Sequence, residues 1–224
     1  MRKEMKTALI VGAGPQGRID AEILQAQGGW DSIEFIDDNP ALWGQAINGV
    51  PVSGGIASLR ARRRDAIGTV VALGNPVVRL RIARQLEGME IPFLNAIHPS
   101  AVVSPSAKIG KGVTIEPLAN VCANAVLGDH IPVMAGAVIG HDAMLADGAT
   151  VTACAMIGGR VQIGRGAFIC VRATILARVV IGDGSVVAAG SLVGRDVPPG
   201  ALVFGVPARK MEDVGPDFDW SRLL

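Results

Sequence analysis

AVIGHD AMLADG ATVTAC AMIGGR VQIGRG, residues 137–166, is a run of six-residue units, and the same division extends without insertion from Ala101 to Asp196. All sixteen third positions are aliphatic, and Ala occupies ten of the sixteen first positions. Six steps of 100° do not return to the same face of an α-helix, so the period excludes a helix. In strands, three such units close one coil of about eighteen residues. The sequence therefore predicts a parallel β-helix of a little over five coils.

The first half of the chain reads as a small nucleotide-binding unit. TALIVGAGPQGR, residues 7–18, is an apolar strand followed by a glycine-rich turn and a helix, and IEFIDD, residues 33–38, is a strand ending on two carboxylates. TVVALGNP, residues 69–76, predicts a third strand and turn. Turn amides and a helix N-terminus favour phosphate, and an acidic strand end can bind a sugar hydroxyl. We expect a Rossmann-like unit.

The glycine spacing leaves more than one reading open. Gly12, Gly14 and Gly17 match G-x-G-x-x-G, yet an NAD site usually spans two halves of such a sheet and this unit has room for only about three or four strands. A unit of half that size fits a nucleotide sugar better than it fits the dinucleotide of a dehydrogenase. The alternative is that these glycines only allow tight packing.

Composition narrows the class of protein further. Lys plus Arg total 21 against 20 for Asp plus Glu, which gives no electrostatic case for nucleic acid or an anionic membrane. No apolar run reaches the roughly 20 residues of a membrane span, and no leader follows Met1, so we expect a cytoplasmic protein. We expect a solvated surface turn where four arginines cluster, at Arg60, Arg62, Arg63 and Arg64.

We also expect the three cysteines to be buried, reduced thiols that neither form disulfides nor bind zinc; they are Cys122, Cys154 and Cys170.

Histidine chemistry is restricted to three residues, of which His141 is the best candidate base. It precedes Asp142, a carboxylate that can raise its basicity, and small residues one coil away leave room around the ring. Acetyl transfer to an amine needs a base and oxyanion donors, but no nucleophilic side chain. We expect His98, at the junction of the two halves, to be non-catalytic, and His130 to lie on a different face. A γ-type carbonic anhydrase, with three histidines around zinc, is a competing hypothesis.

A family resemblance rests on six motifs: GAGPQG, the FIDD strand end, VALGN, NAIHPSA, the G-H-D of AVIGHD and the closing GVPARKM. Together they resemble the bacterial sugar O- and N-acyltransferases, a family that includes sialic acid O-acetyltransferases and UDP-4-amino-sugar and GDP-perosamine N-acetyltransferases. The resemblance runs from about residue 7 to 211. It implies a left-handed β-helix, a homotrimer with the site between subunits, and acetyl-CoA as co-substrate without a metal.

The resemblance also implies roles for individual residues, and here the family's catalytic base and its acidic partner fall on His141 and Asp142. Contacts to the nucleotide sugar and to acetyl-CoA are carried over as two sets. The first set is Gly14, Pro15, Gln16, Asp37, Asp38 and Gly74, and the second is Thr150, Val171, Ala189, Arg209 and Lys210.

Departures from the family pattern bear on the substrate. Pro15 and Gln16 stand where many relatives carry glycine and histidine, and Pro15 removes one backbone donor.

We expect three segments: a Rossmann-like unit at 1–98, an acyltransferase β-helix at 99–211 and a tail at 212–224. The predicted activity is acetyl-CoA-dependent N-acetylation of a nucleotide-linked 4-amino sugar. O-acetylation of a sugar such as sialic acid, or a non-catalytic sugar-nucleotide sensor, are the alternatives.

Overall fold

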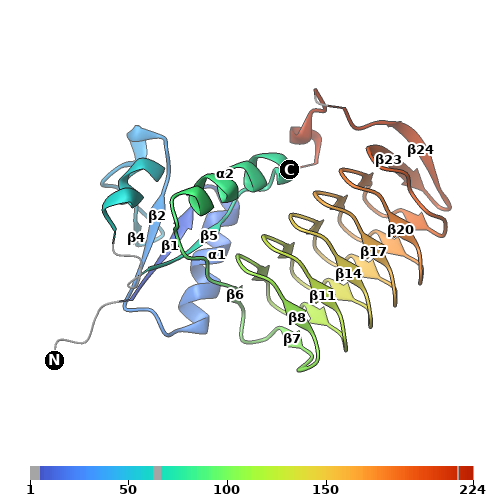
Figure 1. The fold of residues 1–224 in the computed structure, drawn as a ribbon, viewed down its shortest axis with the longest axis horizontal. Coiled ribbons are helices and arrows are strands. Elements are labelled where there is room, and N and C mark those ends of the chain that lie inside the picture. Colours follow the sequence, from blue (N-terminus) through green and yellow to red (C-terminus); the bar gives the residue numbers. More distant parts are fainter. Residues whose placement is uncertain (1–5, 63–66, 216, 224) are drawn as a thin grey trace.

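A computed structural model describes residues 6–62, 67–215 and 217–223 of the chain. A small α/β unit is followed by a long β-helix whose coils stack along one axis (Figure 1). This confirms the mixed fold expected from the sequence, including the left-handed parallel β-helix. Among the described residues, no helix is both long enough and apolar enough to cross a membrane.

The α/β unit is a three-stranded parallel sheet in the order β2-β1-β5, covered by helices on both faces. Its central strand, TALIV, is buried along its whole length, as expected for a parallel strand covered on both sides. Alternate residues of this strand pack into two separate clusters, one with α1 and one with α2. The elements are β1 (Thr7–Val11), α1 (Pro15–Gln27), β2 (Ser32–Ile36), a 3₁₀ helix (Pro40–Leu42), β3 (Ala46–Ile47), β4 (Val50–Pro51), a second 3₁₀ helix (Ile56–Ala61), β5 (Ile67–Val71) and α2 (Pro76–Gly88).

The three glycines of the turn between β1 and α1 have different roles. Gly12 has φ +107°, a conformation that favours glycine, and a Cβ at Gly17 would overlap the carbonyl oxygen of Gly12. A Cβ at Gly14 would meet nothing within 4 Å. Packing therefore explains Gly12 and Gly17, whereas Gly14 faces open space.

The β-helix consists of two-residue strands at the second and third positions of each six-residue unit. Residues eighteen apart pair in parallel, as Val121 does with Val103 and Ile139, so the third positions form the predicted interior columns. Three sheets result, with the orders β22-β19-β16-β13-β10-β7, β20-β17-β14-β11-β8 and β24-β23-β21-β18-β15-β12-β9-β6. The strands are β6 (Ala96–Ile97), β7 (Val102–Val103), β8 (Lys108–Ile109), β9 (Thr114–Ile115), β10 (Asn120–Val121), β11 (Val126–Leu127), β12 (Pro132–Val133), β13 (Val138–Ile139), β14 (Met144–Leu145), β15 (Thr150–Val151), β16 (Met156–Ile157), β17 (Gln162–Ile163), β18 (Phe168–Ile169), β19 (Thr174–Ile175), β20 (Val180–Ile181), β21 (Val186–Val187), β22 (Leu192–Val193), β23 (Ala201–Gly205) and β24 (Ala208–Asp213).

The turns depend on the last position of each unit. Except in the first and last units of the array, at Ser106 and Asp196, residues there adopt positive φ, both glycines such as Gly148 and side-chain-bearing residues such as His130 (φ 58°) and Asp142 (φ 56°). Asn, Asp and Gly tolerate this region best. The small first positions, such as Ala137, are buried against the interior, so they pack the corners while the sixth positions turn the chain.

The β-helix begins one unit earlier than the repeat count indicates. β6 pairs in parallel with β9, and Ile97 packs against the interior cluster, which places the first strand before the expected boundary at residue 98. The unit that contains β6 starts with Asn95, whose side chain bonds the backbone of Gly110 and Val113 in the next coil. The repeat count missed this unit because polar Asn95 stands at its first position, where most units have alanine.

One face of the β-helix is covered by the chain itself. We call the sheet from β6 to β24 the covered face; the α/β unit packs on its first coils, and its outward residues Thr114 and Thr150 are buried. The tail packs on its later coils, where Phe218 and Trp220 contact the cluster around Phe168. The tail, which the sequence left uninterpreted, therefore closes the far end of this face.

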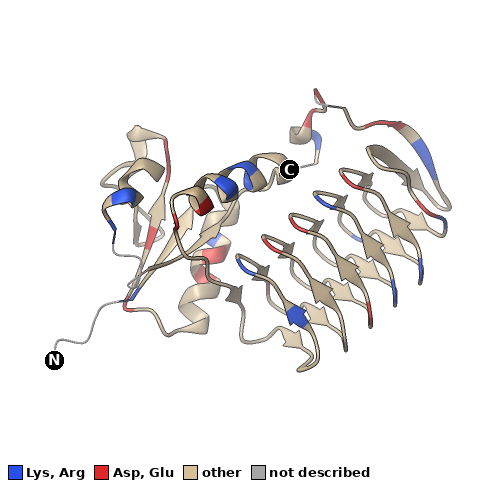
Figure 2. Ribbon diagram, in the orientation of Figure 1, with Lys and Arg blue, Asp and Glu red and all other residues tan. Residues whose placement is uncertain are grey.

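The other two sheets are the open faces: the β7 sheet and the β8 sheet. They expose large apolar side chains, with Val102 and Met156 on the first and Met144 and Val180 on the second. Figure 2 shows that the charged residues of the β-helix lie mostly at its turns and leave the flat faces largely uncharged. Nothing in the described part of the chain packs over these apolar strands as the α/β unit and the tail pack over the covered face.

Two minor expectations need correction. Cys154 is exposed and Cys122 half-buried, so only Cys170 is a buried thiol; Cys154 stands at a sixth position, where the side chain faces outward. In the arginine cluster, Arg62 does not extend freely into solvent but pairs with Glu34 at 2.6 Å. Arg63 and Arg64 lie outside the described residues.

Candidate active site

His141 and Asp142 form a hydrogen-bonded pair at the corner between the two open faces. His141 Nδ1 lies 2.8 Å from Asp142 Oδ2, and Asn124 Nδ2 donates to the other carboxylate oxygen at 3.2 Å. The hydrogen bond from His141, followed by that from Asn124, holds the pKa of Asp142 below its usual value. A carboxylate that accepts from Nδ1–H leaves Nε2 as the unprotonated, basic nitrogen. The pair therefore presents a base on an exposed corner.

Gly159, one coil above, makes room for this imidazole, as the sequence predicted. A Cβ at Gly159 would overlap His141 Nε2, the ring nitrogen that does not face Asp142. The ring therefore occupies space that any other residue would fill.

We expect Gly159→Ala to lower turnover by about tenfold or more while leaving the fold intact, because the exposed ring can swing away from the new methyl and lose its alignment. Steady-state kinetics and thermal unfolding test this. Gly88→Ala, where a Cβ meets nothing within 4 Å, is the matched control and should not change turnover. Wild-type turnover in Gly159→Ala would contradict the packing argument.

The glycine-rich turn retains the features expected of a phosphate site. α1 begins at Pro15 after Gly14, and no described side chain caps this N-terminus. Uncapped amides at a helix N-terminus favour an anion. Asp37 accepts from the backbone of Ala13 and Asn39, at 2.9 Å each, so it orders the turn. Asp38 is exposed and accepts from the Ile56 amide through one oxygen, and within the described residues no hydrogen bond to its other oxygen is found, which leaves that oxygen for a ligand.

Gln16 connects this turn to the β-helix, which the sequence did not reveal. Its amide nitrogen donates to Asp20 at 3.0 Å and to Glu116 at 3.1 Å, and both acidic residues are buried. Burial raises the pKa of Asp20 to about 7, with Glu116 adding to the increase and the hydrogen bond from Gln16 opposing it. The sequence does not reveal this group, because Gln16 and Glu116 are a hundred residues apart in the chain.

The raised pKa of Asp20 predicts a pH-dependent stability. The folded state holds a proton on Asp20 between about pH 4 and 7 that the unfolded chain releases, so the free energy of unfolding falls as pH rises through this window. We expect a slope of up to about 1.4 kcal/mol per pH unit from this group. Urea unfolding at pH 5, 6 and 7 should show a shallower slope in Asp20→Asn. An unchanged slope would show that Asp20 does not titrate in this window.

Arg79 is the main polar link between the two units, and it too was not foreseen. It is 2% exposed and donates to the carbonyls of Gly74, His130 and Gly148 and to the hydroxyl of Thr150. Burial lowers the pKa of Arg79 to about 10, so it stays charged at neutral pH. Thr150 is completely buried with its hydroxyl on Arg79, so its side chain is not exposed, and its expected contact with acetyl-CoA stays a prediction.

The remaining residues expected to contact acetyl-CoA lie elsewhere. Val171 and Ala189 are exposed and stand one coil apart at the corner between the covered face and the β7 sheet. Arg209 and Lys210 are exposed on β24 and line a cavity of about 300 Å³ at the end of the β-helix. Lys210 also pairs with Asp213 at 2.6 Å.

A single chain does not bring these groups together. The His141–Asp142 pair, the glycine-rich turn against the covered face, and the exposed Val171 and Ala189 occupy different sides of the β-helix. Within one chain, these residues therefore do not form a single site.

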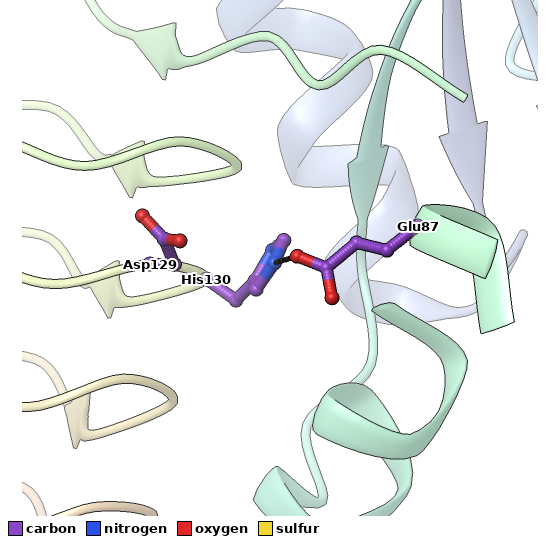
Figure 3. A group of neighbouring side chains, drawn as sticks. All are labelled: Glu87, Asp129 and His130. Atoms are coloured by element: carbon purple, nitrogen blue, oxygen red, sulfur yellow. Dashed lines mark ion pairs between the residues drawn. The ribbon is translucent and has the colours of Figure 1, made fainter. Parts of the chain in front are cut away.

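The other histidines are separated from His141 as expected. His98 bonds Ser100 at a third corner, and His130 lies buried beneath the α/β unit. The three histidines thus stand on three corners of the chain, which is not the arrangement of one zinc site within a chain. Figure 3 shows His130 beside Glu87 and Asp129, with potential ligand atoms within 4.8 Å of one another.

A cation already lies beside the two carboxylates of this group. Lys111 Nζ, which is not drawn in Figure 3, lies 2.8 Å from Glu87 and 3.9 Å from Asp129. The hydrogen bond with Glu87 raises the pKa of Lys111 and lowers that of Glu87. The pKa of His130 is lowered, chiefly by burial, so this ring is neutral near pH 7. The lysine ammonium balances the carboxylates at this interface.

Comparisons with known proteins agree with this geometry. The PglD N-terminal domain matches residues 7–86, and the bacterial transferase hexapeptide (six repeats) matches residues 160–195. UDP-N-acetylbacillosamine N-acetyltransferase of Bacillus subtilis (strain 168) is 32% identical over 114 residues, which make up 50% of this chain and 51% of that protein. The match thus spans about half the length of this curated relative.

Solved structures match over nearly the whole chain. A point mutant of perosamine N-acetyltransferase from Caulobacter crescentus, in complex with CoA and GDP-perosamine, is 32% identical with a TM-score of 0.86, covering 92% of this chain and 97% of that one. The acetyltransferase domain of PglB from Neisseria gonorrhoeae FA1090, in complex with acetyl coenzyme A, is 31% identical with a TM-score of 0.89, covering 92% and 100%. Since both the fold and this level of identity extend across 97% and 100% of these two solved chains, this chain belongs to the bacterial sugar O- and N-acyltransferase family.

Proposed function

We propose that this protein transfers the acetyl group of acetyl-CoA to the amino group of a nucleotide-linked amino sugar, with His141 as general base. The observation that carries the proposal is the His141–Asp142 pair, whose geometry leaves Nε2 basic and exposed. Relatives solved with GDP-perosamine and CoA, and with acetyl-CoA, support the two substrates. The cytoplasm, where a cell keeps both substrates, is the proposed location.

The reaction follows from the position of the base. As the amine nitrogen attacks the thioester carbonyl, His141 Nε2 accepts the proton that the nitrogen loses, and Asp142 stabilises the resulting imidazolium. Exposed backbone N–H groups at the turns are candidate donors to the oxyanion. Collapse expels the CoA thiolate, which takes a proton from the imidazolium, so the products are the N-acetylated sugar and free CoA thiol.

The proposed active unit is a homotrimer. The open faces carry Val102 and Met156 on one side and Met144 and Val180 on the other, and His141 stands at the corner that joins them. Exposed apolar strands of this extent favour association with a matching surface. Three copies packed through these faces would bring the glycine-rich turn and Val171 of neighbouring chains to His141. Sedimentation equilibrium should give the mass of three chains.

A thiol-release screen tests the activity. Acetyl-CoA is offered with UDP-, GDP- and dTDP-linked 4-amino sugars, and with sialic acid as the hydroxyl-bearing alternative. We expect thiol release with at least one amino sugar and not with the hydroxyl acceptor. Release only with sialic acid would replace N-acetylation by O-acetylation, and ligand binding without thiol release would indicate a sensor.

A further inference from the structure

The side-chain nitrogen of Gln16 lies between two buried carboxylates. It is 3.0 Å from Asp20 Oδ1, one turn along α1, and 3.1 Å from Glu116 Oε1 on the β-helix. Asp20 is 1% exposed and Glu116 6%. We call these three residues the Gln16 clamp.

The clamp fixes which way the amide of Gln16 faces. Glu116 Oε1 accepts from Gln16, and Glu116 Oε2 already accepts from the Ala135 amide at 3.0 Å. Asp20 Oδ1 also accepts from Gln16, and a proton on Asp20 is accommodated at Oδ2, 3.4 Å from the Thr114 hydroxyl. A reversed amide would place its oxygen against the Glu116 carboxylate, which is repulsive. The nitrogen therefore faces the carboxylates, and the only remaining polar atom of the side chain is Oε1.

The oxygen of Gln16 is free to meet a ligand. Among the described residues, none donates a hydrogen bond to Oε1, and this atom is not one of the buried side-chain atoms that lack a partner, so it is accessible. Gln16 is also half-exposed beside the open Gly14. A clamped side chain that offers an acceptor here is already oriented before the ligand arrives, which lowers the entropy cost of binding.

An acceptor at this place does not suit phosphate. Pro15 has no N–H, so the backbone amides of Gln16 and Gly17 are the first donors at the N-terminus of α1. They favour phosphate. The side-chain oxygen next to them carries negative partial charge and would repel a phosphate oxygen, so its partner must be a hydrogen-bond donor beside the phosphates.

We infer that Gln16 determines substrate specificity as an acceptor: the clamp aims its oxygen at a hydroxyl or N–H group of the nucleotide sugar next to the diphosphate. The inference rests on the proposed function only in the identity of the ligand. Gln16 thus accepts a hydrogen bond from the ligand, whereas a phosphate-binding side chain donates one. Discrimination follows because a ligand that lacks the donor leaves the oriented oxygen without a partner.

Gln16→Lys tests whether Gln16 accepts a hydrogen bond from the ligand or contacts a phosphate. The ammonium keeps a donor between Asp20 and Glu116 but removes the acceptor and adds positive charge. If Gln16 contacts phosphate, the variant binds more tightly; if Gln16 accepts from a donor, it binds more weakly. We expect the KM for the accepted nucleotide sugar to rise about 5- to 10-fold, the cost of a lost hydrogen bond. Gln16→Arg is the second variant, should the first fail to fold.

Gln25→Lys is the matched control, because it adds the same charge to an exposed position of the same helix. It should leave the KM unchanged. Calorimetric Kd values for UDP, GDP and dTDP locate the donor. A Kd that weakens by the same factor as the KM places the donor on the nucleotide, and a KM effect without a Kd effect places it on the sugar.

Two outcomes would overturn the inference: tighter binding in Gln16→Lys and Gln16→Arg, or unchanged KM and Kd in both. If the wild-type protein releases no thiol with any amino sugar, the proposed function fails, and calorimetric Kd values for the UDP-, GDP- and dTDP-linked amino sugars decide the role of Gln16. In that case a Kd weakened 5- to 10-fold in Gln16→Lys supports the acceptor, and an equal or tighter Kd refutes it.

Discussion

His141→Asn should reduce kcat by at least about 10²-fold, because a positioned general base typically contributes about 10² to 10⁴-fold. Asparagine retains a polar group beside Asp142 but cannot take up a proton at neutral pH. Nothing else in the described part of the corner supplies a base in the same place, since Asn124 and Arg160 are the other polar neighbours of Asp142. Thiol release at saturating substrates measures the effect.

The same substitution at His98 is the control for the loss of an imidazole. His98 bonds Ser100 and lies on another corner, so His98→Asn should retain near-wild-type turnover. If His141→Asn retained more than about a tenth of the wild-type kcat, proton transfer would have to be assigned to another group, and the proposed mechanism would be wrong.

Arg79→Met should destabilise the fold by about 3 kcal/mol or more, because each buried acceptor left without a donor costs about 1–3 kcal/mol and Arg79 donates to several. Its guanidinium satisfies carbonyls of both units, among them Leu73 on the α/β side and Gly148 on the β-helix. Methionine fills much of the volume but leaves those buried oxygens without a donor. The free energy of unfolding in urea at pH 7 is the measurement.

Arg81→Met is the matched control, because Arg81 lies two residues further along α2 on its exposed side. It should change the free energy of unfolding by less than about 0.5 kcal/mol. A loss below about 1 kcal/mol in Arg79→Met would mean that water replaces the guanidinium and that the interface does not depend on it.

The sequence predicted those features that repeat at short range. Aliphatic third positions such as Ile139 and Ile157 specify interior columns, and the small residue at 159 correctly indicated room for His141. The unit containing Ile97 was missed because Asn95 replaces the usual small residue and is held by hydrogen bonds instead.

The rest could not be predicted because it depends on contacts distant in sequence. Nothing near Gln16 indicates that Glu116, a hundred residues away, holds its amide. Thr150 resembles any other strand threonine until Arg79 from α2 is placed on its hydroxyl. A hexad position defines which way a side chain faces, but not what the rest of the chain packs over it.

Because residues eighteen apart pair in parallel, the coils of the β-helix stack at a regular spacing. Each coil advances about 4.8 Å along the axis, and Val171 and Ala189 are separated by one such step. The distance along the axis between His141 and Val171 is therefore set by the five six-residue units that separate these two positions in the sequence. Insertion or removal of one coil would keep every interior column intact while changing that distance in a fixed step. In such a scaffold, the distance between the acetyl acceptor and the acetyl donor changes only in steps that are too large for gradual adjustment.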